Sequence, residues 1–117
     1  MTAELQAISN TPGITGLCLH RGAEVLHHNL PATYGDAAAA DLCHVVSGIF
    51  STYADAERPV TQGYFQYPES GILVVKSARG KNAAAKECFL TFLVSDQTAI
   101  QTVLAPARAF LARQARA

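Results

Sequence analysis

The sequence predicts a single α+β domain over residues 1–117, built as a three-layer α/β/α sandwich around a five-stranded antiparallel sheet. Two observations lead to this fold class. Five short apolar segments are separated by turns that contain glycine or proline, which is typical of strands. Three other segments carry apolar residues at helical spacing. Their order predicts α-β-β-α-β-β-β-α, with the first and last helices on one face of the sheet and the central helix on the other.

The N-terminal part predicts one short helix followed by a β-hairpin. Residues 2–10 have Leu5 and Ile8 on one side and Thr2 as a candidate cap, and a Pro-Gly pair ends this segment. Residues 14–20 and 24–30 are two apolar runs around a glycine turn, which favours a hairpin. The turn contains two or three residues, so the register of this hairpin stays open.

The central helix is expected over residues 36–57, with Asp36 as its N-cap. One face is an apolar stripe of Leu42, Val45, Val46, Ile49, Phe50 and Tyr53. A solvated helix face usually carries lysine and glutamate, but the opposite face here carries the small residues Ala40, Ser47, Gly48, Ser51 and Ala54, with Asp41, His44 and Asp55 to solvate it. Small residues let a second helix approach closely. We therefore expect this helix to pack on two sides, against its own sheet and against a partner subunit.

Three strands and a final helix are predicted for the C-terminal half. Residues 60–67, 71–78 and 84–95 are joined by short turns and predict an antiparallel meander, with Gly63 as a bulge. Residues 97–116 predict a helix capped by Ser95 or Asp96, with Ile100, Val103, Leu104, Ala107 and Leu111 on one face. Pro106 lies inside this segment, and a proline inside a helix destabilises the helix by about 3 kcal/mol. It predicts a kink, or two helices in place of one.

Composition limits the classes of partner. Half of the residues are hydrophobic, 15% are charged and the formal net charge is zero. So little charge predicts a surface that is covered by self-association or by a constant partner. The absence of a basic excess argues against nucleic acid and anionic membranes as partners. The N-terminus lacks a basic segment followed by an apolar run, so we expect a cytoplasmic protein without a signal peptide.

Cys18, Cys43 and Cys88 have no CxxC spacing and are expected to be reduced, buried thiols.

Histidines and cysteines are the first candidates for chemistry. His20, His27 and His28 share the hairpin, but successive strand residues face opposite ways and no carboxylate or cysteine completes a metal-binding spacing. Cys43 with His44, or His44 with Asp41, suggests nucleophilic catalysis, yet adjacent helical positions do not face each other. We therefore predict no metal site and no catalytic residue.

Two segments share some features with phosphate-binding sites. Gly35 and Asp36 precede a helix, but an acidic cap repels anions. The segment GKNAAAK at 80–86 lacks the P-loop pattern and leads into a strand. We predict no cofactor and no enzymatic activity.

Tyr64, Phe65 and Tyr67 form a dense aromatic group on a predicted edge strand. Aromatic side chains stack on single-stranded RNA, but the basic neighbours that would hold phosphate are missing. Strand pairing with a second copy of the chain is the favoured interpretation.

The segment PGITGLCLHRGAEVL at 12–26, the two-sided helix and the element order together resemble the roadblock/dynein light-chain family, which has a profilin-like architecture. In that family the first hairpin has a small-residue strand, a turn ending in glycine and a second apolar strand. Arg21 departs from the acidic residue often found before that glycine, and Pro106 interrupts the last helix.

The resemblance implies a homodimer, or a heterodimer with a similar chain, whose central helices pack side by side and whose middle strands join two sheets. Interface residues are then Ala40, Ser47, Gly48, Ser51, Ala54, Tyr64, Phe65 and Tyr67. Family members are platforms for Ras-like small GTPases or adaptor light chains, and some bacterial ones regulate a polarity GTPase. The leading hypothesis is a non-enzymatic dimeric adaptor that binds or regulates a small GTPase. The alternatives are a small-ligand sensor of PAS or profilin-like architecture and an enzyme that uses the histidine-rich hairpin.

Overall fold

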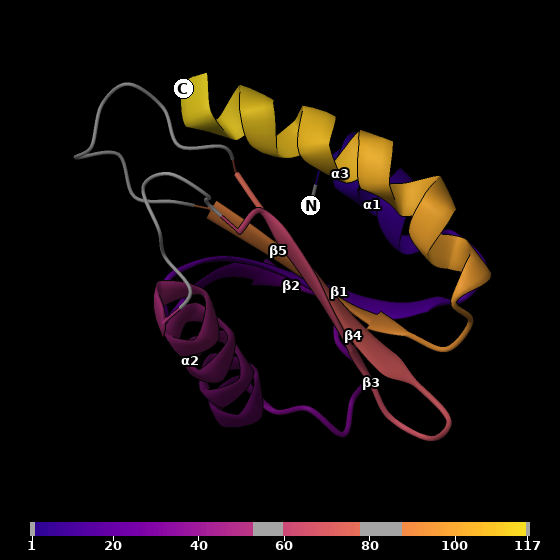
Figure 1. Cartoon of the computed structure of the whole chain (residues 1–117), viewed down its shortest axis with the longest axis horizontal. Helices are drawn as coiled ribbons and strands as arrows, with labels where there is room; N and C mark the ends of the chain where they lie inside the picture. Colours follow the sequence, from indigo (N-terminus) through magenta and orange to yellow (C-terminus); the bar gives the residue numbers. More distant parts are fainter. Residues whose placement is uncertain (1, 53–59, 78–87, 117) are drawn as a thin grey trace.

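The computed structural model places the chain in three layers, with a sheet between two layers of helices (Figure 1). The structure describes residues 2–52, 60–77 and 88–116. The elements are α1 (Ala3–Ser9), β1 (Ile14–Arg21), β2 (Glu24–His28), α2 (Asp36–Thr52), β3 (Gln62–Gln66), β4 (Gly71–Lys76), β5 (Cys88–Val94) and α3 (Thr98–Arg116). The predicted α+β class and the element order are confirmed. The predicted turn at 79–82 and the first residues of the segment at 84–95 lie outside the described residues.

The five strands form one antiparallel sheet in the order β2-β1-β5-β4-β3. The predicted meander of β3, β4 and β5 is confirmed, and the N-terminal hairpin joins it through pairing of β1 with β5. A bulge at Gly63 was a wrong prediction, because the register runs without a shift from Gln62↔Val75 to Gln66↔Gly71. The register shifts lie in β1. One is between Leu19 and His20 in the pairing with β2, and the other is between Ile14 and Gly16 in the pairing with β5. Among the described strands, β2 and β3 are therefore the edges of the sheet.

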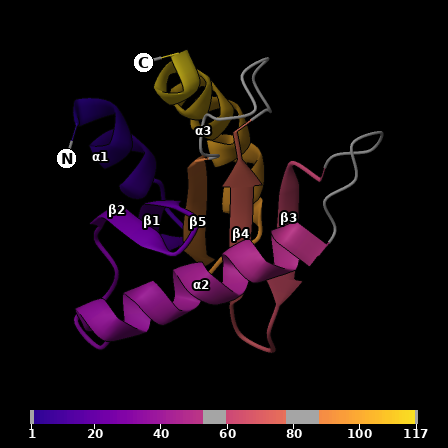
Figure 2. The ribbon, with the colours of Figure 1, turned by 90° about the vertical axis from the view of Figure 1, so that its left-hand side faces the viewer.

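Helices α1 and α3 cover one face of the sheet and α2 crosses the other, as predicted (Figure 2). The face under α1 and α3 holds the larger core, in which leucine, valine and phenylalanine side chains of β1, β4 and β5 meet both helices. The smaller core under α2 consists of Val46, Phe50, Val74 and Phe89, with Leu42, Val60, Phe65 and Ile72 packed against it. Both faces of the central strands are thus covered, which explains why their sequences do not alternate cleanly.

Local signals placed the ends of the outer helices well. The Thr2 hydroxyl accepts a hydrogen bond from the Leu5 amide, so it caps α1 as expected. The Asp96 carboxylate accepts from both the amide and the hydroxyl of Thr98 at the start of α3. Helix α3 continues through Pro106, so the alternative of two separate helices was wrong. Its apolar face, buried at Val103, Ala107 and Leu111, anchors it to the sheet and outweighs the cost of the proline.

Helix α2 is turned about its axis relative to the prediction. Its buried residues are Ala39, Cys43, Val46 and Phe50. Val45, placed in the apolar stripe by the sequence, is 56% exposed, and that assignment was wrong. The small side chains of Ala39 and Cys43 let the first half of α2 lie close over the sheet, and this contact decides which face is buried. Asp36 is the first helical residue and not the cap preceding it, and residues 53–57 of the predicted helix lie outside the described part.

Candidate partner-binding surface on the central helix

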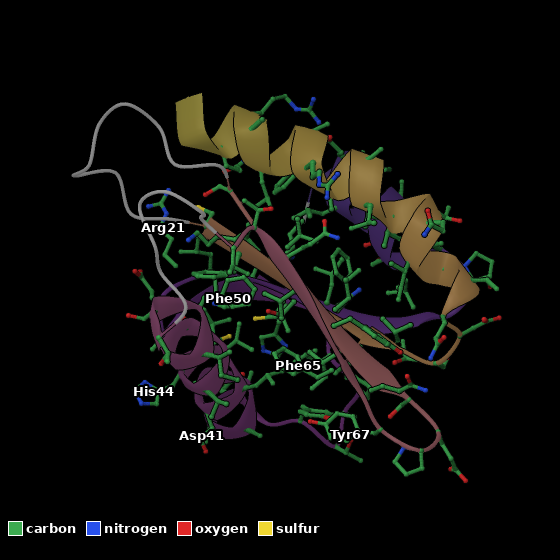
Figure 3. All side chains as sticks on the ribbon, in the orientation of Figure 1. Arg21, Asp41, His44, Phe50, Phe65 and Tyr67 are labelled. Atoms are coloured by element: carbon green, nitrogen blue, oxygen red, sulfur yellow. The ribbon has the colours of Figure 1, made fainter. Side chains whose placement is uncertain are left out.

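The outer face of α2 combines small residues with one exposed aliphatic side chain. Val45 is exposed, and a Cβ placed on Gly48 would meet no atom within 4 Å. Ser51 lies on the same exposed side, one turn after Gly48. Asp41 and His44 project away from the sheet, whereas Phe50 points toward it (Figure 3). This set of exposed residues, Asp41, His44, Val45, Gly48 and Ser51, is called the outer face below.

The outer face is unusual in its charge. Residues 36–52 contain no lysine and no arginine, and Asp36 and Asp41 are the acidic residues of this helix. A helix that faces water along its whole length normally carries charges of both signs. Low charge and small side chains are what a close helix–helix contact requires, so the face suits an apolar partner surface better than bulk water.

The structure distributes the predicted interface residues of α2 over two zones. Gly48 and Ser51 are on the outer face, while Ala40 and Ser47 are half-buried on its flank. The Ser47 hydroxyl is buried and has no hydrogen-bond partner among the described residues. Ala54 lies outside the described residues.

The predicted interface aromatics belong to the free edge strand β3 and the turn after it, and they point in different directions. Tyr64 packs toward the core under α3, whereas Phe65 packs under α2. Tyr67 is 51% exposed beyond the end of the strand (Figure 3). The end of α2 reaches this edge, because a Cβ on Gly63 would lie 3.6 Å from the Phe50 ring. The C-terminal end of α2 therefore lies beside the β3 edge.

The three hairpin histidines have separate surroundings. His20 is fully buried, with Nδ1 2.8 Å from the Gly22 carbonyl oxygen and Nε2 2.8 Å from the Thr91 hydroxyl. Its ring stacks on Phe89 at a centroid distance of 5.0 Å. Nε2 of His28 lies 3.3 Å from the Asp36 carboxylate. Within residues 2–52, 60–77 and 88–116, no three histidine, cysteine or acidic side chains come together as a metal-binding group.

Cys43 and His44 lie on different sides of α2, as expected for adjacent helical positions. Cys43 is fully buried and His44 is exposed. Cys43 is part of the helix–sheet core, which agrees with its predicted structural role.

A close thiol pair is the feature that sequence reasoning missed. The Sγ atoms of Cys18 in β1 and Cys43 in α2 are 3.3 Å apart, and both residues are fully buried. Hydrogen bonds from Cys18 and then His20 lower the pKa of Cys43 to about 5 against the effect of burial, and the same sulfur–sulfur contact raises the pKa of Cys18. Twenty-five positions separate the two cysteines. Neither their spacing nor their local sequence indicated this contact.

The described surface has open hollows beside the start of α2 and at the ends of the strands. One of about 490 Å³ lies between β2 and the start of α2, next to His27, His28, Asp36 and Ala40. The space between the second half of α2 and the sheet is filled by the side chains of Val46, Phe50, Val74 and Phe89. Such a packed interior gives no support to a ligand cavity at this place.

Comparison with known proteins bears on the fold. No protein-family model matches the sequence, and no curated protein sequence matches it. Among solved structures, MglB with a tetrameric arrangement aligns with 97% of this chain and 85% of its own, with a TM-score of 0.66 and 15% identity. A roadblock/LC7 domain from Streptomyces avermitilis aligns with 96% of this chain and 90% of its own, with a TM-score of 0.65 and 18% identity.

The chain has a roadblock-like fold. The expectation drawn from the first hairpin, the central helix and the element order is thereby confirmed at the level of architecture. Within this roadblock-like fold, α2 holds Ala40, Ser47, Gly48 and Ser51 of the predicted interface, and β3 holds Tyr64 and Phe65. None of the helices in the described residues has the length and apolar character needed to cross a membrane.

Proposed function

We propose that this chain is a non-enzymatic adaptor subunit that pairs with a second copy of itself or with a similar roadblock-like chain. In that pair it binds or regulates a Ras-like small GTPase. The outer face of α2 carries this proposal, because an exposed valine beside an exposed glycine and serine suits a helix packed at short range.

Two further observations support self-association. The β3 edge is free, half-buried aromatic residues lie along it, and the end of α2 adjoins it. A second subunit related by a two-fold axis would therefore cover both features in one continuous contact. A solved chain of the same fold, MglB, is found in a tetrameric arrangement. Pairing of α2 with α2 and of β3 with β3 would remove the exposed Val45 and the unpaired strand edge from water.

The GTPase part of the proposal rests on the family resemblance of the first hairpin and on the shared fold. Roadblock-like proteins include platforms for Ras-like GTPases, and a continuous surface made by two subunits is a suitable platform. The non-catalytic part of the proposal is supported by the separation of Cys43, which is buried against the sheet, from His44, which is exposed on another side of α2.

The first experiment tests the pairing. The solution mass is measured by light scattering over a dilution series for the wild type, for Ser51→Arg, and for Gln101→Arg as a control on an exposed position of α3. We expect wild type and Gln101→Arg to be dimers at tens of micromolar, and Ser51→Arg to dissociate because it places a charge in the helix contact. A monomeric wild type, or a Ser51→Arg dimer of unchanged affinity, would rule out this interface.

The second experiment tests the GTPase. Purified Ras-like GTPases from the same genome are loaded with GDP or with a non-hydrolysable GTP analogue and passed over the immobilised chain. We expect retention of one GTPase that depends on the bound nucleotide, or a change in its rate of GTP hydrolysis. Equal retention of both forms together with an unchanged rate would contradict the GTPase assignment while leaving the dimer intact.

A further inference from the structure

The contact between Cys18 and Cys43 joins two different layers of the fold. Cys18 is on the face of β1 that α2 covers, and Cys43 is on the buried face of α2. Their sulfur atoms lie 3.3 Å apart, and both cysteines are free. The two sulfur atoms need to move only slightly closer together to form a disulfide bond. A bond here would tie the helix that carries the outer face to the centre of the sheet.

The surroundings of the pair contain polar groups and not a uniformly apolar core. His20 follows Cys18 by two positions on the same strand face, and its hydrogen bonds to the Gly22 carbonyl and to Thr91 hold the ring in place. The contact with the Cys18 thiol, and to a smaller extent the nearby His20, lowers the pKa of Cys43 and so favours its thiolate. Thiolates are the reactive form of cysteine toward oxidants, so the site is prepared for the first step of thiol oxidation.

Access to the pair depends on the first half of α2, whose buried side chains are small. The buried residues in this half of the helix are Ala39 and Cys43, whereas the larger Val46 and Phe50 hold the second half. The open hollow of about 490 Å³ runs beside Asp36 and Ala40 on the same half. Small side chains bury little apolar area, so a small opening of this half costs less than opening of the second half.

We propose that Cys18 and Cys43 are a peroxide-sensitive dithiol that closes to an intramolecular disulfide between β1 and α2. The oxidant is hydrogen peroxide, which is small enough to reach the pair when the start of α2 opens. This inference does not depend on the GTPase assignment. The disulfide would fix the inner side of α2 to the sheet, and the outer face of the same helix carries the proposed interface.

The reaction balances in two steps. The Cys43 thiolate attacks one oxygen of hydrogen peroxide, the O–O bond breaks, and Cys43 becomes a sulfenic acid while hydroxide leaves and is protonated to water. The Cys18 thiol then loses its proton, and its sulfur attacks the Cys43 sulfur. The S–O bond breaks, the S–S bond forms, and a second water leaves. Overall, two thiols and one hydrogen peroxide give one disulfide and two waters, and a dithiol reductant reverses the change.

Cys88 provides an internal control. It is buried on the opposite face of the sheet, in the core under α1 and α3, with the Arg21 side chain 3.4 Å from its sulfur. It has neither Cys18 nor Cys43 beside it, so it has no thiol with which to form an intramolecular disulfide. Cys88→Ser is therefore expected to behave as the wild type does.

The test treats the folded, reduced wild type with hydrogen peroxide, quenches it by acid, alkylates the free thiols after denaturation and maps the peptides by mass spectrometry. We expect one species that has lost two hydrogen atoms, with residues 18 and 43 in linked peptides and Cys88 alkylated. We also expect the oxidised protein to melt roughly 5–10 °C above the reduced one, because the cross-link restricts the unfolded chain.

Single variants distinguish Cys43, which reacts with peroxide, from Cys18, which closes the disulfide. In Cys18→Ser the sulfenic acid on Cys43 has no second thiol, and it is trapped by dimedone; in Cys43→Ser, Cys18 is left unlabelled. Circular dichroism first confirms that each variant is folded. The proposal is overturned if the wild type stays folded and yields no peptide linking residues 18 and 43. It is also overturned if that link forms only after the protein has been denatured in urea.

Discussion

The ring of Tyr64 in β3 lies directly over Gly71 in β4, so that a Cβ at Gly71 would collide with the phenol ring. Gly71 is buried as a result. Because the two residues belong to neighbouring strands of one hairpin, Tyr64 already has a partner within its own chain. In the proposed dimer, Tyr64 would therefore act indirectly, by shaping the edge of the sheet.

Replacement of Gly71 by alanine tests this packing. We expect Gly71→Ala to lower the free energy of unfolding by about 1–3 kcal/mol, because the added methyl group displaces the ring. In combination with Tyr64→Leu the cost should shrink, with a coupling of about 0.5–3 kcal/mol in a double-mutant cycle followed by urea denaturation. Strictly additive effects would show that the ring does not cover the glycine.

Phe50 anchors the second half of α2. Its ring meets Phe89 of β5 edge to face at a centroid distance of 5.4 Å, and it is 4% exposed. Phe50→Ala should therefore cost about 3–5 kcal/mol of unfolding free energy. The matched control is Val45→Ala on the exposed side of the same helix, with an expected change within about 0.5 kcal/mol at a protein concentration low enough to keep the subunit monomeric. Urea denaturation measures both, and equal losses would mean that the helix is rotated differently from the structure.

Gly48→Ala separates monomer stability from pairing. An exposed glycine inside a helix is less stable than alanine by roughly 0.5–1 kcal/mol, so the isolated subunit should gain about that amount. In a dimer with α2 packed on α2, the new methyl group enters the contact, and we expect the dissociation constant to rise by about tenfold or more, equal to 1.4 kcal/mol.

Denaturation at low protein concentration and light scattering over a dilution series give the two values for Gly48→Ala. Ser51→Ala, which keeps a small side chain on the outer face, is the control. Tighter pairing in Gly48→Ala would contradict a contact centred on this glycine.

Asp96 makes the start of α3 sensitive to acid. Hydrogen bonds from the Thr98 amide and hydroxyl hold the pKa of the Asp96 carboxyl below its ordinary value of 3.8. A lowered pKa in the folded state adds stability that is present above the unfolded-state pKa and is lost as the pH falls through the folded-state pKa.

Asn retains the cap but does not titrate. We therefore expect the melting temperature of the wild type to exceed that of Asp96→Asn at neutral pH, and the gap to close as the pH falls below about 4. A gap that is constant between neutral pH and about pH 3 would show that this carboxylate is not coupled to folding.

Much of the architecture could be predicted from local signals. The caps at Thr2 and Asp96, the glycine turn between β1 and β2, and the apolar spacing of Val103, Ala107 and Leu111 each depend on residues close in sequence. Such signals were sufficient for the order of helices and strands, for the meander and for the two-sided covering of the sheet. The resemblance of the first hairpin to roadblock-like proteins indicated the same fold.

The rotation of α2 and the contact of Cys18 with Cys43 were decided by tertiary structure alone. The aliphatic residues of α2 surround most of the helix, so periodicity did not distinguish Val45 from Ala39 until the sheet was placed against it. The pairing of β1 with β5 sets which face of β1 lies under α2, and it brings together two thiols that are far apart in the chain. Short-range preferences determine elements, whereas their long-range packing determines which side chains meet.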